Sequence, residues 1–70
     1  MTAAEWIRTF AEEIGCDPPD QDLMDEILRL ASVAAHASER MAAPIACYLA
    51  ATTGRPVAEL REVAEGLAGG

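Results

Sequence analysis

Prolines and glycines divide this chain into short segments, and that division limits its fold more than any other feature. Pro18 and Pro19 lack the amide donors that a helix needs, and each biases the residue before it toward extended backbone. Pro44 has the same effect near the middle of the chain. Gly54 and Pro56 supply a helix stop and a new start. The sequence therefore predicts four helices separated by these breaks.

Capping residues mark the ends of the first two predicted helices. Thr2 begins a capping box, and Gly15 suits the left-handed position that closes a helix, so the first helix runs to about residue 14. Its apolar side chains recur at i, i+4 and i+8, which places Trp6, Phe10 and Ile14 on one stripe. Asp20 is the expected N-cap of a second helix over about 21–38.

The second helix is the longest and is predicted to be the central one. One face is apolar and is formed by Leu23, Ile27, Leu30, Ala31 and Ala34. At about 100° per residue, the opposite side collects Asp25, Arg29, Ser32 and His36. Asp25 and Arg29 are spaced i, i+4 in the favourable order, so we expect them to form an ion pair.

The third and fourth helices carry apolar stripes of their own. In the third helix Met41, Ile45, Leu49 and Thr52 share one stripe, with Tyr48 beside it. Ala42, Ala46 and Ala50 allow close contact, and we expect the leucines and alanines of residues 20–53 to be hidden. The fourth helix is predicted from Val57 to about Leu67. Hydrophobic residues make up 51% of the chain, many of them alanine, and few positions favour strands. We therefore predict an all-α fold, a small bundle of four short helices in a single domain over residues 1–70.

The charge balance excludes several classes of partner. The formal net charge is -7, and the five basic residues are all arginine. Nucleic-acid binding requires clustered cations, and an anionic membrane surface repels an acidic chain, so we expect neither partner. No signal segment follows Met1, and we expect a cytoplasmic protein with reduced thiols. Cys16 and Cys47 lack the spacing of a metal or redox motif. They could form a disulfide with each other, but we interpret them as buried packing thiols.

One polar cluster could form a site at the end of the second helix. His36, Glu39 and Arg40 are close in sequence, and Arg29 lies on the same helix side as His36. One interpretation is a pocket that holds an anionic group or a partner carboxylate. The other is that His36 and Arg40 cap the carbonyl end of the helix, where cations are favoured. No nucleophile is paired with His36 and no metal-ligand set surrounds it, so we predict no enzyme activity, no metal and no cofactor.

The central part of the chain also resembles a known family. The run Ala35-His36, Glu39-Arg40, Ala43-Pro44 and Tyr48-Leu49-Ala50 is similar to a small bacterial all-helical domain family of unknown function. The resemblance extends to Trp6-Ile7, to the Gly15-Cys16-Asp17 turn and to the last helix. Members of that family occur alone or fused to the nucleotidyltransferase that makes molybdopterin-guanine dinucleotide. The resemblance implies an accessory role in molybdenum-cofactor synthesis.

Two functional hypotheses follow. The first is a non-enzymatic accessory or protein-interaction domain that forms a homo-oligomer or docks on a partner enzyme, because the chain is small, apolar and without a catalytic pattern. The second is a small-molecule domain that binds a nucleotide or phosphate through His36, Glu39 and Arg40.

Overall fold

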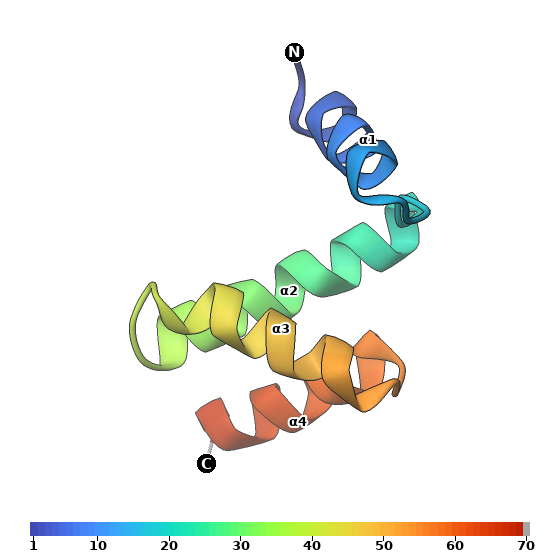
Figure 1. Ribbon diagram of the computed structural model, residues 1–70. Helices are drawn as coiled ribbons and strands as arrows, with labels where there is room; N and C mark the ends of the chain where they lie inside the picture. Colours follow the sequence, from blue (N-terminus) through green and yellow to red (C-terminus); the bar gives the residue numbers. More distant parts are fainter. Residues whose placement is uncertain (70) are drawn as a thin grey trace.

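The computed structural model describes residues 1–69, which form four α-helices (Figure 1). In chain order they are α1 (Ala3–Ile14), α2 (Gln21–Ala37), α3 (Ala42–Thr53) and α4 (Val57–Gly69). No strand is present within this described part of the chain. The predicted all-α fold of four short helices is confirmed. None of the four helices is both long enough and apolar enough to cross a bilayer.

The predicted caps explain where the helices begin and end. The Thr2 hydroxyl accepts a hydrogen bond from the amide of Glu5 at 3.1 Å, and the Asp20 carboxylate accepts one from the amide of Leu23 at 2.8 Å. Gly15 ends α1 with a φ of 78°, a left-handed angle that costs glycine little. Short side-chain signals were therefore enough to place the first two helices.

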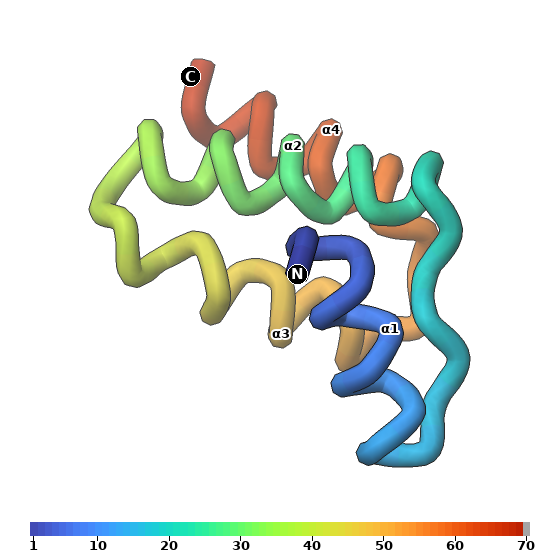
Figure 2. Tube along the Cα trace, turned by 90° about the horizontal axis from the view of Figure 1, so that it is seen from above, coloured from blue at the N-terminus to red at the C-terminus, as the bar shows by residue number. Residues whose placement is uncertain are grey.

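Helix α2 is the centre of the packed part of the molecule, as predicted. Both α3 and α4 pack against it, whereas α3 and α4 meet each other only slightly. In the view from above, α3 and α4 leave their shared turn at one end and lie on different sides of α2 (Figure 2). Leu30 of α2 and Ala50 of α3 are among the few buried residues.

Helix α3 packs with its alanine face rather than with its large side chains. Ala42 and Ala46 are partly buried and Ala50 is buried, whereas Ile45 and Leu49 are exposed. The expectation that the leucines of this segment are hidden is therefore wrong for Leu49, whereas the alanines make the close contact expected of them. Methyl-sized side chains let two helix axes approach closely, so the small face makes the tighter contact with α2.

Helix α1 makes no close backbone contact with the other three helices, although its residue Ala11 is buried. No Cα atom of α1 comes within 8 Å of one in α2, α3 or α4 beyond the local chain neighbours. In Figure 1 it projects from the start of α2, on the side of α2 away from α4. Its apolar stripe consequently has no helix packed over it within the described residues.

An ion-pair cluster joins α2 to α4. Arg61 of α4 donates from Nε to Glu26 of α2 at 2.9 Å, and from Nη1 to Glu65 at 2.6 Å. The predicted pair between Asp25 and Arg29 is wrong: Arg29 lies 3.6 Å from Glu26, and Asp25 accepts instead from the side-chain amide of Gln21. The Glu26 carboxylate is therefore shared between Arg61 of α4 and Arg29 of its own helix.

Candidate functional site

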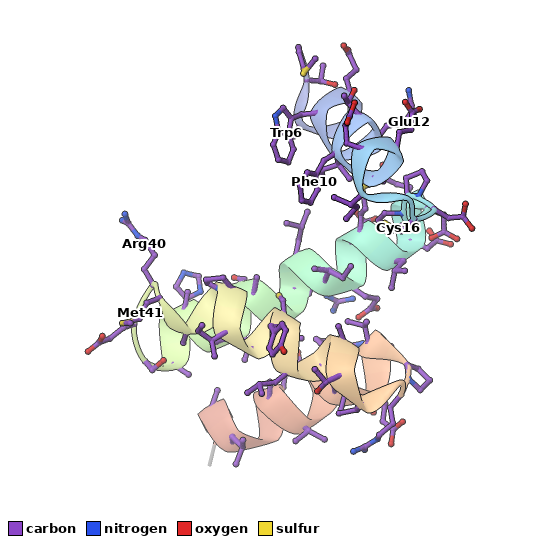
Figure 3. All side chains as sticks on the ribbon, viewed as in Figure 1. Trp6, Phe10, Glu12, Cys16, Arg40 and Met41 are labelled. Atoms are coloured by element: carbon purple, nitrogen blue, oxygen red, sulfur yellow. The ribbon has the colours of Figure 1, made fainter. Side chains whose placement is uncertain are left out.

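The apolar side chains of α1 form an exposed surface, named here the α1 stripe (Trp6, Phe10 and Ile14). Trp6 is 55% exposed, Phe10 49% and Ile14 59%. The two aromatic rings stack with their centroids 5.1 Å apart and an angle of 15° between their planes. They leave α1 on the side away from Glu12 (Figure 3). Stacking holds the rings together as one rigid apolar surface, so little side-chain entropy is lost when something covers them.

A second apolar surface is the groove between α3 and α4, named here the α3–α4 groove. It exists because both helices pack on α2 while hardly contacting each other. Its volume is about 240 Å³, and it is open to solvent. Its lining is almost wholly apolar and mostly alanine: Val33, Ala34, Ala37, Ser38, Ala42, Ala46, Ala64, Leu67 and Ala68.

Larger side chains extend the edges of this groove. Ile45 and Leu49 lie three and seven positions after the groove residue Ala42, so both are on nearly the same side of α3 as Ala42. On α4, Val63 lies one turn before the groove residue Leu67, on the same side of the helix. All four of these large side chains are exposed. The groove thus has a floor of methyl groups and apolar edges.

These two surfaces expose far more apolar area than isolated surface leucines would. Contiguous exposed apolar patches on soluble proteins mark sites of protein interaction or ligand binding. The groove offers almost no hydrogen-bonding group, because Ser38 is its one polar residue and the Ser38 hydroxyl already donates to the carbonyl of Ala34 at 2.9 Å. The chemistry available here is burial of an apolar partner.

His36 lies at a different hollow, formed by α2 and α4. This hollow is wide open, with a volume of about 330 Å³, and its lining is Ser32, Val33, His36, Ala37, Glu65 and Ala68. The imidazole Nδ1 lies 3.3 Å from the Ser32 hydroxyl. Glu65 contributes a carboxylate, held by Arg61. A polar contact with His36 is available here, although the neighbouring carboxylate makes the hollow less favourable for an anion.

The other predicted site residues do not line this hollow. Arg40 lies in the turn between α2 and α3 and points away from the helices (Figure 3). Glu39 is in the same turn and is exposed; its carbonyl accepts the amide of Ala42 at 2.9 Å. Arg29 is engaged with Glu26. The structure therefore places His36 at a hollow and brings none of the other three residues into its lining, and binding of a ligand by this set stays a prediction.

The two cysteines have different environments, and both thiols are free. Cys47 of α3 packs against α2, with its sulfur 3.9 Å from the carbonyl of Ile27, and burial raises the pKa of this thiol. Cys16 is exposed in the connection between α1 and α2. The interpretation as a packing thiol thus holds for Cys47 and is wrong for Cys16.

Sequence reasoning missed the α3–α4 groove, although a signal for it exists. Ala42, Ala46 and Ala50 recur every fourth residue, which marks a face of α3 that is uniformly small. Placing that face against α2 would have turned Ile45 and Leu49 outward. The splay of α4 away from α3 has no comparable local signal, because it depends on how both helices pack on α2.

Comparison with known proteins gives one match. The family described as a domain of unknown function (DUF6457) matches residues 1–69. No curated protein and no solved structure matches the chain.

Proposed function

The chain belongs to the DUF6457 family of domains of unknown function, and we propose that it is a non-enzymatic protein-interaction domain, accessory to an enzyme of molybdenum-cofactor synthesis. Partner binding would bury the α1 stripe and the α3–α4 groove. The domain would contribute binding energy and position, and the chemistry would belong to its partner.

The exposed α1 stripe is the observation that carries this proposal. Trp6 and Phe10 stack on each other, yet each remains about half exposed. Aromatic residues with few rotatable bonds are the side chains most enriched at the centres of protein interfaces. Fully burying one large apolar side chain is worth about 1.5–3 kcal/mol, so a partner that covers the exposed halves of both rings gains about that much in total.

The choice of partner class rests on the family resemblance of the central helices. That resemblance is to domains that stand alone or are fused to the nucleotidyltransferase of molybdopterin-guanine dinucleotide synthesis. A domain that is covalently joined to an enzyme in some proteins can bind the same enzyme non-covalently when it stands alone, since fusion mainly raises the local concentration. We therefore propose this nucleotidyltransferase as the partner enzyme.

The test is isothermal titration of the purified chain into the nucleotidyltransferase from the same organism. A complex is expected, with a negative heat-capacity change because apolar surface is buried. Trp6→Ala should weaken it about 30-fold or more, as expected for an interface hot spot.

The matched control is Glu12→Gln, a change on the other side of α1 that should leave the affinity unchanged. Absence of a complex, or equal affinity for the wild type and Trp6→Ala, would contradict the proposal.

A further inference from the structure

A second copy of this chain could cover both the α1 stripe and the α3–α4 groove. We infer that α1 of each copy lies in the α3–α4 groove of the other, so that two chains form a closed dimer with twofold symmetry. This inference rests on the proposed function, since it uses the same interaction surface, and a second copy and the partner enzyme would therefore compete for the α1 stripe.

The shapes of the two surfaces are complementary. The α1 stripe presents two aromatic rings and an isoleucine, whereas the groove floor consists largely of alanine methyl groups. Large side chains pack well against small ones, because the layers then interdigitate without voids. An unfilled groove of about 240 Å³ would hold several waters, at roughly 30 Å³ each, beside methyl groups that cannot hydrogen-bond to them.

The exposed area is sufficient for a stable dimer. The chain has an accessible surface of 5272 Å² at a mass of 7.4 kDa. A folded monomer of that mass is expected to expose about 4,200 Å². The surplus is about 1,000 Å², whereas a standard protein interface buries about 800 Å² on each partner. One reciprocal contact would therefore return each chain to an ordinary surface area.

Reaching the groove of its own chain would stretch the connection between α1 and α2 almost fully. Residues 15–20 span at most about 22 Å when fully extended. The groove floor begins at Val33, about 18 Å along α2 from its first residue. The α3–α4 turn lies at the same end of the molecule as the start of α2 and would have to be bypassed (Figure 2). A second copy reaches the groove without stretching this connection.

Symmetry explains why the assembly stops at two chains. Each copy has one α1 stripe and one α3–α4 groove, so a single exchange satisfies both surfaces on both chains. A one-way contact would leave a stripe and a groove free at the ends and would extend into a filament. Reciprocal exchange is therefore the arrangement that buries all of this apolar surface.

Sedimentation equilibrium of the full chain tests the oligomeric state. The wild type should sediment as a dimer at micromolar concentration, and Glu12→Gln should behave the same. Phe10→Ser should raise the dimer dissociation constant about 30-fold or more. Leu67→Glu changes the groove instead of the stripe, at a residue that is 80% exposed. It should weaken the dimer similarly, while the circular dichroism spectrum stays helical. Equal dissociation constants for Leu67→Glu and wild type would overturn the assignment of the groove.

Disulfide trapping between two different variants tests the geometry. Both carry Cys16→Ser; one also carries Phe10→Cys and the other Leu67→Cys. Mild oxidation of the mixture should give a crosslinked heterodimer, whereas replacing the first variant by one with Glu12→Cys should not. Equal crosslinking in the two mixtures would overturn the proposal that α1 of one copy lies in the α3–α4 groove of the other.

Failure of the dimer is distinguishable from failure of the proposed function. A wild-type chain that stays monomeric at 100-fold higher concentration, and yet binds the nucleotidyltransferase through Trp6, would overturn the dimer and leave the interaction domain standing. A monomer that binds neither a second copy nor the enzyme would overturn both.

Discussion

At the scale of single residues, the Asp20 carboxylate is the clearest determinant of where α2 begins. It accepts the amide of Leu23 at 2.8 Å and satisfies one of the four amides that a helix start leaves without a partner. We expect Asp20→Ala to lower the free energy of unfolding by about 1 kcal/mol. Urea denaturation followed by circular dichroism measures this. Asp20→Asn is the control: asparagine caps equally well, so equal losses for both variants would contradict the capping role.

The pair formed by Glu26 and Arg61 makes a pH-dependent contribution to stability. The hydrogen bond from Arg61 is the largest cause and lowers the pKa of Glu26 below its usual 4.5. Burial opposes it as the second-largest cause, and the charges of Arg61 and Arg29 lower the pKa further. The unfolded chain therefore binds this proton at a higher pH than the folded chain does. The contribution is present above about pH 4.5 and is lost as the pH falls through the lower folded value.

Glu26→Gln should remove this contribution. We expect the difference in urea midpoint between wild type and Glu26→Gln to be largest at pH 6–7 and to shrink as the pH falls below 4.5. Glu62→Gln on the exposed face of α4 is the control and should show no such convergence. If the difference stayed constant from pH 7 to pH 3, the pKa of Glu26 would be the same in the folded and the unfolded chain, which would contradict this prediction.

Residue-level features differ in how far the sequence predicts them. The caps at Thr2 and Asp20 were predictable because each involves an amide three positions away. The bond from Arg61 to Glu26 joins residues 35 positions apart, and the sequence offers Arg61 nearer partners, including Glu65, which it also binds. Only the packing of α4 on α2 decides that Arg61 reaches Glu26.

At the scale of elements, glycine has opposite effects at the end of α3 and inside α4. Gly54 ends α3 with a φ of 71°, where a side chain would be strained, while Gly66 lies within α4 with no atom within 4 Å of an added Cβ. We expect Gly54→Ala to destabilise the fold by about 1–2 kcal/mol and Gly66→Ala to stabilise it by about 0.5–1 kcal/mol. Thermal unfolding of both variants checks the two signs. Stabilisation by Gly54→Ala would contradict the left-handed end of α3.

Helix boundaries were predictable, whereas helix faces were less so. Prolines and glycines act within a few residues, so all four observed helices lie where the breaks allow them. Helix α3 has two apolar faces, one of large side chains and one of alanines, and either could have packed on α2. The alanine face lies on α2, because a close approach of two helices gains more contact than a distant one does.

At the scale of the whole molecule, the arrangement of helices leaves the chain more extended than its length requires. Its radius of gyration is 12.7 Å, against about 11 Å for an average domain of this length. The difference reflects α1, which projects from the packed helices (Figure 1). Sequence patterns gave the number of helices and the central place of α2. They could not give the separate position of α1, because its stripe is equally suited to its own chain and to a partner.

The net charge of -7 on each chain gives the proposed dimer a characteristic response to salt. Bringing two acidic chains together costs Coulomb energy, and this cost is screened once the Debye length, about 10 Å at 0.1 M, is shorter than the separation of most charges. Neither the α1 stripe nor the groove lining includes a charged residue, so the proposed contact has no ion pair that salt would weaken. Raising sodium chloride from 0.05 to 0.5 M should therefore lower the dimer dissociation constant by about tenfold. Sedimentation equilibrium across this range measures the change, and the thermal midpoint should rise with protein concentration at each salt level, because dimerisation stabilises only the folded chain. A dissociation constant that increases with salt would mean that ion pairs join the two copies, and the α1 stripe would then not be what holds them together.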